Sequence, residues 1–189
     1  MEPFKNVFNE DLVQGMAEHF ARHGSEFDRE AICQVVLKDL NQLELKERSN
    51  KIVEAMAVYL PGDFKTSAKI LEASLHPDPP DDLYGITVSA KGLAGWAIMP
   101  MGEYVGQNGL EHFDLSLKLL KAMTSRFTSE SAIRHFFLKD HKKTLKTIKP
   151  WTKDRNRHVR RLVSEGSRPL LPWSPRIGAF VDDPLLILP

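Results

Sequence analysis

The sequence predicts an all-α protein, a superhelix of HEAT-like helical repeats known as an α–α solenoid. Apolar residues recur at helical spacing through most of the 189 residues, and short connections join the segments that carry them. No segment shows the two-residue alternation of β-branched residues that is typical of strands, so we expect no sheet. A chain of this length is expected to form a single domain around one sizeable core.

Helices are expected throughout the first 75 residues, which form the N-terminal part of the domain. Asn9 is placed to cap the first helix, and Asp28 to cap the second. The third helix should end at Pro61-Gly62, and Asp63 should cap the fourth. Each of these boundaries is predicted from a residue that favours a helix start or stop.

A linker is expected over residues 76–84, which begin with the Pro- and Asp-rich stretch HPDPPDD. Residues 85–189 then form the second part of the domain. Within it, residues 92–104 are predicted to be a buried helix kinked at Pro100, and residues 110–123 an amphipathic helix. Shorter helices are expected at 129–138, 141–151 and 156–165.

The last residues resemble the start of another helix. Asp183 is a good capping residue, and Pro184 fits the first helical position. Four apolar residues follow before the sequence stops, and a helix of about one turn is marginal on its own. We therefore expect a repeat array truncated at its C-terminus, with a tail tucked against the last repeat as the alternative.

The charge distribution points to a polyanionic partner. Residues 118–176 contain 16 Lys or Arg and 4 Asp or Glu, a net charge of +12, whereas the rest of the chain has 10 basic and 21 acidic residues and a net charge of −11. A short basic run usually marks a solvated helix face. Here the cations are interleaved with aromatic residues such as Trp151 and Trp173, which favours nucleic-acid binding.

Several other classes of protein are excluded by composition. No run approaches the ~20 apolar residues of a membrane span, and the N-terminus lacks the basic and apolar parts of a signal peptide. Cys33 is a single cysteine, so it forms no internal disulfide. The seven histidines show no metal-ligand spacing, and no glycine-rich phosphate loop is present. We expect a soluble cytoplasmic protein without metal or cofactor.

Two carboxylates stand out because they lie inside the basic segment. Glu130 is at the start of a predicted helix, near the positive end of its dipole, and Glu165 is in the last turn of another. Either could serve a catalytic role. The commoner role for such residues is an ion pair with an arginine four positions away. Glu130 would pair with Arg134, and Glu165 with Arg161.

The loop after Glu165 is unusual for a plain connector, since its sequence from 168 to 176 is RPLLPWSPR. Three prolines stiffen it and fix Trp173 relative to Glu165. Such a loop can present an aromatic ring to a base and guanidinium groups to phosphates. In the alternative interpretation, Trp173 fills the core between repeats.

One motif favours a repeat array over a helix bundle. Residues 151–162, WTKDRNRHVRRL, have the form of the second helix of a HEAT-like repeat, in which Trp and Leu pack between repeats, Asp caps and paired arginines lie toward one edge. Ala132-Ile133-Arg134 is a weaker copy of this pattern in the preceding unit. Any amphipathic basic helix can mimic such a motif.

These motifs resemble the AlkC family, bacterial DNA glycosylases of the AlkC/AlkD superfamily that are built from HEAT-like repeats. The resemblance is most specific over residues 158–173, HVRRLVSEGSRPLLPW, and covers essentially the whole chain. Its other matching segments are MEPFK (1–5), LELKER (43–48), YLPGDF (59–64), LEASL (71–75), GLAGW (92–96), MPM (99–101) and ESAIR (130–134).

The resemblance implies excision of cationic N-alkylated bases, such as 3-methyladenine and 3-methylcytosine, from duplex DNA in base excision repair. It implies a concave basic surface that grips DNA without full base flipping. Glu165 and Glu130 match the active-site carboxylates, and Trp173 matches a residue close to the lesion. We expect a monomer whose DNA contacts come from Trp173, Arg160, Arg161, Arg168, Arg157 and Lys153.

The chemistry is compatible with this set of residues. An alkylated base already carries a positive charge, so it leaves without an acid. A carboxylate can then stabilise the oxocarbenium-like sugar and activate water.

The family continues into at least one further repeat, which carries an Asp thought essential for catalysis, and some members add an immunoglobulin-like domain. This chain stops first. Two other functions therefore stay open: a DNA-binding repeat protein or fragment without catalysis, and a protein-interaction scaffold.

Overall fold

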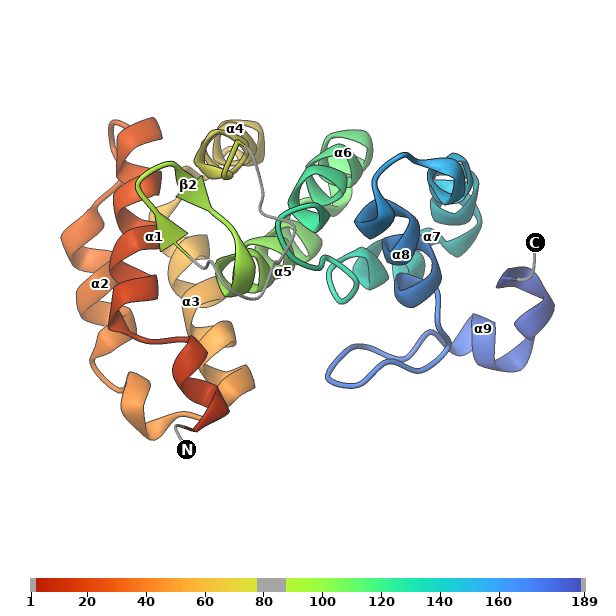
Figure 1. Ribbon diagram of the computed structural model, residues 1–189, viewed down its shortest axis with the longest axis horizontal. Coiled ribbons are helices and arrows are strands. Elements are labelled where there is room, and N and C mark those ends of the chain that lie inside the picture. The colour runs from red at the N-terminus through yellow and green to blue at the C-terminus, as the bar shows by residue number, and fades with distance from the viewer. Residues whose placement is uncertain (1–2, 78–87, 188–189) are drawn as a thin grey trace.

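The computed structural model describes residues 3–77 and 88–187, which are almost wholly helical (Figure 1). The α-helices are α1 (Glu10–His23), α2 (Arg29–Leu37), α3 (Leu45–Tyr59), α4 (Phe64–Ser74), α5 (Ile98–Asn108), α6 (Phe113–Thr124), α7 (Ile133–Ile148), α8 (Arg157–Gly166) and α9 (Gly178–Asp182). Short 3-10 helices flank them at Phe4–Val7, Leu40–Gln42, Gly95–Ala97, Leu110–His112, Lys149–Lys153 and Pro184–Ile187. The predicted all-α class is confirmed.

Side-chain caps fix the starts of the N-terminal helices where they were predicted. The Asn9 side chain accepts a hydrogen bond from the Leu12 amide at 3.0 Å. The Asp28 side chain accepts one from the Ala31 amide at 2.9 Å. Asp63 caps α4 in the same way. Each cap satisfies an amide that the first turn of a helix leaves unpaired, so local sequence was enough to place these boundaries.

The prediction that the chain has no sheet is wrong, because a short antiparallel hairpin pairs β1 (Val88–Ser89) with β2 (Gly92–Leu93). The His76 amide donates a hydrogen bond to the Leu93 carbonyl at 2.9 Å, which ties β2 to the end of α4. Gly92 has a φ of +151°, and a Cβ there would lie 2.6 Å from the His76 backbone. Two-residue strands are too short to show alternation in sequence.

The predicted helix over 92–104 therefore begins later, at α5. Pro100 lies in the first turn of α5, where the missing amide hydrogen has no intrahelical partner to lose. It consequently causes no interruption of the helix, and the expected kink is absent at this described position. The predicted linker over 76–84 lies outside the described residues from 78 onward.

A break in α7 separates the two helices that were expected at 129–138 and 141–151. Asp140 has the non-helical angles φ −155° and ψ 90°. Its side chain accepts a hydrogen bond from the Lys143 amide at 2.9 Å, so it acts as the cap of the second segment. Pro150 lies in the 3-10 helix that follows α7, which ends the α-helix before residue 151.

The C-terminal segment packs against the preceding helices. Phe180 of α9 is fully buried, and its ring contacts Phe137 of α7 at 5.3 Å between centroids. The Asp183 side chain accepts a hydrogen bond from the Leu185 amide at 3.1 Å, as predicted for a helix start, although the turn that follows is a 3-10 helix.

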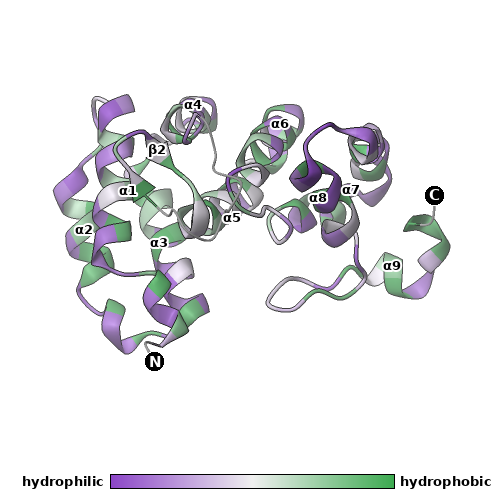
Figure 2. Cartoon of the chain, in the orientation of Figure 1, coloured by the Kyte–Doolittle hydropathy of each residue, from purple (hydrophilic) through white to green (hydrophobic). Residues whose placement is uncertain are grey.

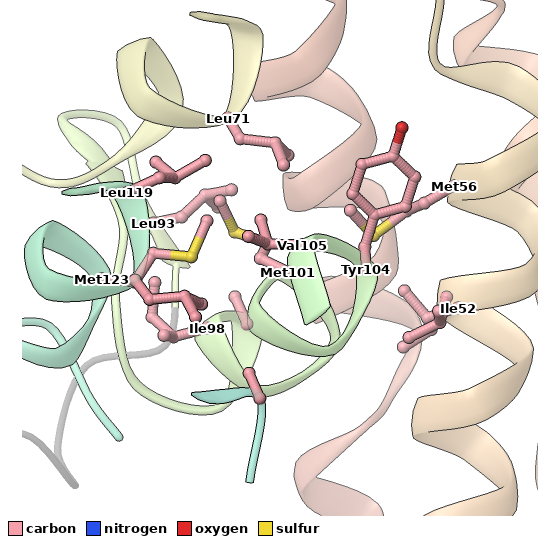
Figure 3. Close-up of a cluster of buried hydrophobic side chains, with 14 of the residues drawn as sticks. Ile52, Met56, Leu71, Leu93, Ile98, Met101, Tyr104, Val105, Leu119 and Met123 are labelled. Carbon is pink, nitrogen blue, oxygen red and sulfur yellow. The ribbon is translucent and has the colours of Figure 1, made fainter. Parts of the chain in front are cut away.

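The core is continuous along the molecule, and α5 lies at its centre, in contact with α3, α4, α6 and α7. Figure 3 shows this cluster, in which α5 side chains such as Met101 and Val105 meet Met56 of α3, Leu71 of α4 and Met123 of α6. The buried side chains of α5 join the N-terminal helices to the C-terminal ones. They thereby fix the segments that form the site.

Val105→Ala should destabilise the protein by about 2 kcal/mol, because it removes two methyl groups at a fully buried position and leaves a cavity. The same substitution at Val58, which is 73% exposed on α3, should cost less than about 0.5 kcal/mol. Urea unfolding of both variants measures the difference. Equal free energies of unfolding would contradict the central place of α5.

Candidate active site

A hollow of about 1010 Å³ lies between the N-terminal helices and α8. It is lined by residues from the 3-10 helices at Phe4–Val7 and Gly95–Ala97, the start of α5, the segment before α7, the first two turns of α8 and the loop that follows α8. Its lining residues are Phe4, Trp96, Met99, Gly102, residues 127–132, Arg157, His158, Arg161 and residues 172–174. The hollow thus gathers segments that are far apart in sequence.

Aromatic side chains form one wall of the hollow. The Trp96 ring contacts those of Phe4 and Phe127, with centroids 5.1 Å and 4.9 Å apart. It also contacts the buried ring of Phe8 at 5.9 Å. Edge-to-face and tilted contacts of this kind hold the rings in fixed positions. The site therefore combines an apolar wall with charged groups from α8 and the segment before α7.

Glu130 lies in the turn before α7, and its side chain is 19% exposed. Its Oε2 accepts a hydrogen bond from Nη1 of Arg161 on α8 at 2.7 Å. The alternative ion pair with Arg134 is wrong, because Arg134 points into the interior. Gly166 permits this approach of α8, since a Cβ there would lie 2.6 Å from Cγ2 of Ile133.

Glu165 lies one turn after Arg161 on α8, with a partly buried side chain. Its Oε2 accepts a hydrogen bond from Nη1 of Arg168 at 3.0 Å. The alternative pairing of Glu165 with Arg161 is wrong as well, since Arg161 is bound to Glu130. Each candidate carboxylate is consequently paired with an arginine that the sequence had assigned to DNA.

Arg134 is fully buried and donates hydrogen bonds to four carbonyl groups. Nε donates to Pro175 at 2.6 Å, Nη2 donates to Pro169 at 3.1 Å, and Nη1 donates to Gly166 at 3.1 Å and to Arg168 at 2.6 Å. Burial and the nearby charge of Arg168 lower the pKa of Arg134. One guanidinium thus fastens both ends of the loop that carries Trp173.

This role of Arg134 was missed at the level of sequence. The weaker copy of the repeat motif at 132–134 predicted an arginine toward the edge of a helix, and that placement is wrong. Apolar neighbours on both sides, in AIRHFF, are a signal of burial that could have indicated it. Its partners lie more than thirty residues further on and could not be read from spacing.

Trp173 is 62% exposed, so the alternative in which it fills the core between repeats is wrong. Its φ is +61°, a backbone conformation that costs a bulky residue of order 1–3 kcal/mol. Such a conformation is kept only where the surrounding structure imposes it. Lys46 Nζ donates to the Trp173 carbonyl at 2.5 Å, and Ser174 Oγ donates to Ser131 Oγ at 2.8 Å. In Figure 1 this loop extends from α8 back toward the N-terminal half.

Lys46 also lies near a partly buried pair formed by His135 and Glu103. Nε2 of His135 on α7 lies 2.7 Å from Oε1 of Glu103 on α5. Burial acts to raise the pKa of the Glu103 carboxyl, but the hydrogen bond and charge of His135, the hydrogen bond from Gln107 and the charge of Lys46 lower it below its ordinary value. Lys46, Glu103 and His135 come from three helices, and no sequence motif indicated them.

The exposed face of α8 is strongly basic, and Figure 2 shows this helix as one of the most hydrophilic parts of the chain. Arg160 Nη1 donates to the carbonyls of Asp154 at 2.8 Å and Arg155 at 3.0 Å. The hollow is lined by four of the described residues that were predicted for the site: Glu130, Arg157, Arg161 and Trp173. The other four are close to these in sequence but are not part of the lining: Lys153, Arg160, Glu165 and Arg168.

Residues 3–77 and 88–187 contain no group of three His, Cys, Asp or Glu side chains that is placed to hold a metal ion. No helix in the same ranges combines the length and the apolar character needed to cross a bilayer.

Comparisons with known proteins were made with both the sequence and the fold. No family model matches the sequence. The structure of Pseudomonas fluorescens alkylpurine DNA glycosylase AlkC, bound to DNA containing an abasic site analog, matches with a TM-score of 0.82 and 30% identity. The match covers 99% of this chain and 48% of that one. The chain is similar to AlkC over its whole length.

A curated relative agrees with this match. YhaZ of Bacillus subtilis, an uncharacterized protein, is 34% identical over 190 residues, which is 100% of this chain and 49% of YhaZ. The resemblance to AlkC and the HEAT-like packing of the helices are confirmed. The chain spans about half the length of both relatives.

Arg134→Met should lower the free energy of unfolding by about 3 kcal/mol, because it leaves buried carbonyl groups without donors. It should also accelerate hydrogen exchange of the amides in residues 166–176. Arg160→Met removes an exposed arginine and should change stability by less than about 1 kcal/mol. Unchanged exchange in the loop of the Arg134→Met variant would contradict the anchoring role.

Proposed function

We propose that this chain excises cationic N-alkylated bases, 3-methyladenine and 3-methylcytosine, from double-stranded DNA. The main support is that Glu130, Arg161 and Trp173 share one hollow in a chain whose fold matches that of AlkC. AlkC itself is an alkylpurine DNA glycosylase that was crystallised with DNA. In this proposal the chain acts in base excision repair, as a cytoplasmic monomer.

The proposed reaction is hydrolysis of the N-glycosidic bond. The alkylated base leaves as a neutral molecule with the electron pair of that bond, so no proton donor is needed. Glu165, which lies on α8 outside the lining of the hollow, is the principal carboxylate: it stabilises the oxocarbenium-like sugar and accepts a proton from the attacking water, and Glu130 assists it from within the lining. The partial burial of both groups strengthens their attraction for a developing cation.

The arginines of α8 and its loop are proposed to hold the DNA backbone. Arg157, Arg160, Arg161 and Arg168 are all exposed, and Lys153 is exposed at the end of the preceding 3-10 helix. Trp173 is proposed to contact the lesion, and its exposed side chain supports this role. The proposal requires neither a metal nor a cofactor.

Incubation with methylated duplex DNA should release free 3-methyladenine and 3-methylcytosine, which mass spectrometry quantifies. Glu165→Gln should reduce the rate of release at least about 100-fold, because it removes the charge that stabilises the transition state. Glu111→Gln is the matched control, since it removes an exposed carboxylate that pairs with Lys139 and is not part of the lining of the hollow, and it should leave the rate unchanged.

A DNA-binding function without catalysis is the second candidate, and one observation favours it: the chain spans about half the length of AlkC. Duplex binding without base release, by the wild-type chain, would support this candidate and overturn the proposed catalysis. Absence of both would leave a protein-interaction scaffold.

The affinity for DNA should fall steeply as salt rises. If the five cations at Lys153, Arg157, Arg160, Arg161 and Arg168 each neutralise a phosphate, the slope of log K against log salt should be about −4.5. Arg157→Gln should reduce that slope by about 1 in magnitude, whereas Lys69→Gln, on the exposed face of α4, should leave it unchanged. Fluorescence anisotropy measures both, and a flat dependence would exclude the α8 surface as the interface.

A further inference from the structure

Arg161 already holds an anion in the free protein. Its Nη1 donates to Oε2 of Glu130 at 2.7 Å, and this is a contact through one nitrogen and one oxygen. The Arg161 side chain is 53% exposed, whereas that of Glu130 is 19% exposed. The guanidinium is therefore open to solvent on one side while it covers the carboxylate on the other.

Such a contact is weak enough to be exchanged. A single hydrogen bond joins the pair and its cation is exposed to solvent, so the pair itself contributes little to stability. A DNA phosphodiester offers two oxygens that match the guanidinium fork, and its binding releases condensed counterions. A phosphate at the mouth of the hollow thus competes favourably with Glu130 for the same group.

We propose that Arg161 is shared between two anions, the Glu130 carboxylate in the free protein and a backbone phosphodiester in the DNA complex. This inference rests on the proposed function, because it takes DNA as the ligand. Transfer of the guanidinium to the phosphate uncovers the Glu130 carboxylate. The negative charge of Glu130 is thereby made available only when the backbone is in place.

The exchange serves the proposed chemistry in both states. In the free protein, the paired carboxylate repels an approaching DNA backbone less than a bare one would. In the complex, the uncovered carboxylate lies in a hollow with a wall of aromatic rings, where its attraction for a cationic lesion is stronger than in water. Backbone binding and lesion chemistry are thus coupled through one side chain.

Arg160 provides a matched control. It is the adjacent residue on α8, it is exposed, and it carries the same charge. Its guanidinium donates to two backbone carbonyls, those of Asp154 and Arg155, and not to a carboxylate in the contacts that the structure describes. Removal of Arg160 changes the net charge as removal of Arg161 does, but leaves the Glu130 pair in place.

A double-mutant cycle on DNA affinity tests the proposal without relying on catalysis. The measurement is anisotropy of a labelled undamaged duplex at one fixed salt concentration, with circular dichroism and urea unfolding to verify that each variant is folded. Glu130→Gln should tighten binding, because it removes the competitor for Arg161 as well as a nearby negative charge. In the Arg161→Gln background, only the effect of the negative charge remains.

The expected result is that the gain from Glu130→Gln is about 2- to 5-fold larger in the wild-type background than in the Arg161→Gln background. The gain in the Arg160→Gln background should equal that in the wild type. Equal gains in all three backgrounds would overturn the proposal, since they would show only long-range repulsion. A loss of affinity on Glu130→Gln would also overturn it, because Arg161 would then need Glu130 to bind phosphate.

The outcomes separate this inference from the proposed function. If the wild-type chain fails to bind the duplex, both are overturned. If the cycle gives the expected coupling but no methylated base is released, the sharing of Arg161 stands and the glycosylase function does not.

Discussion

The geometry of the site depends on one buried cation, the guanidinium of Arg134. It has four carbonyl partners on the segment from Gly166 to Pro175, and no carboxylate within the described residues neutralises it. Because a guanidinium buried without these acceptors would be very costly, the loop must follow the path that supplies them. That path carries Trp173 outward, and Lys46 fixes its carbonyl from the opposite half. An exposed aromatic ring is thereby held in place by buried polar contacts.

The central helix α5 supplies the second constraint. It is buried among α3, α4, α6 and α7, so the N-terminal helices and the basic C-terminal helices keep a fixed relation. The hollow lies at this junction, with aromatic residues from both parts of the chain, such as Phe4 and Trp96, and arginines from α8. Gly166 lets α8 pack closely enough for Arg161 to reach Glu130. The fold thus brings arginines of the basic segment to the same hollow as the aromatic residues, and the site has an apolar wall and a cationic rim.

Local signals in the sequence predicted most of the fold and four residues that line the hollow, but not the contacts that these residues make. The caps at Asn9, Asp28 and Asp63 were predictable because each acts within one helical turn. The β1–β2 hairpin was not, since it depends on the backbone of His76 in another segment. The ion pairs of both carboxylates were assigned at helical spacing and were wrong, because the carbonyls of a distant loop bind Arg134 and leave Glu130 to Arg161. Groups that are distant in sequence thus compete with the carboxylates for each arginine, and this competition determines which ion pairs form.

The central claim is that Trp173 and the two carboxylates meet the damaged sugar from one side. A crystal structure of this chain with a duplex that carries a cationic azasugar in place of the lesion nucleotide tests it most directly. The account predicts that the azasugar nitrogen faces Glu165 and Glu130, that Trp173 contacts the nucleotide, and that Arg161 contacts a phosphate. DNA bound along the acidic N-terminal helices, with the azasugar remote from both carboxylates, would contradict it.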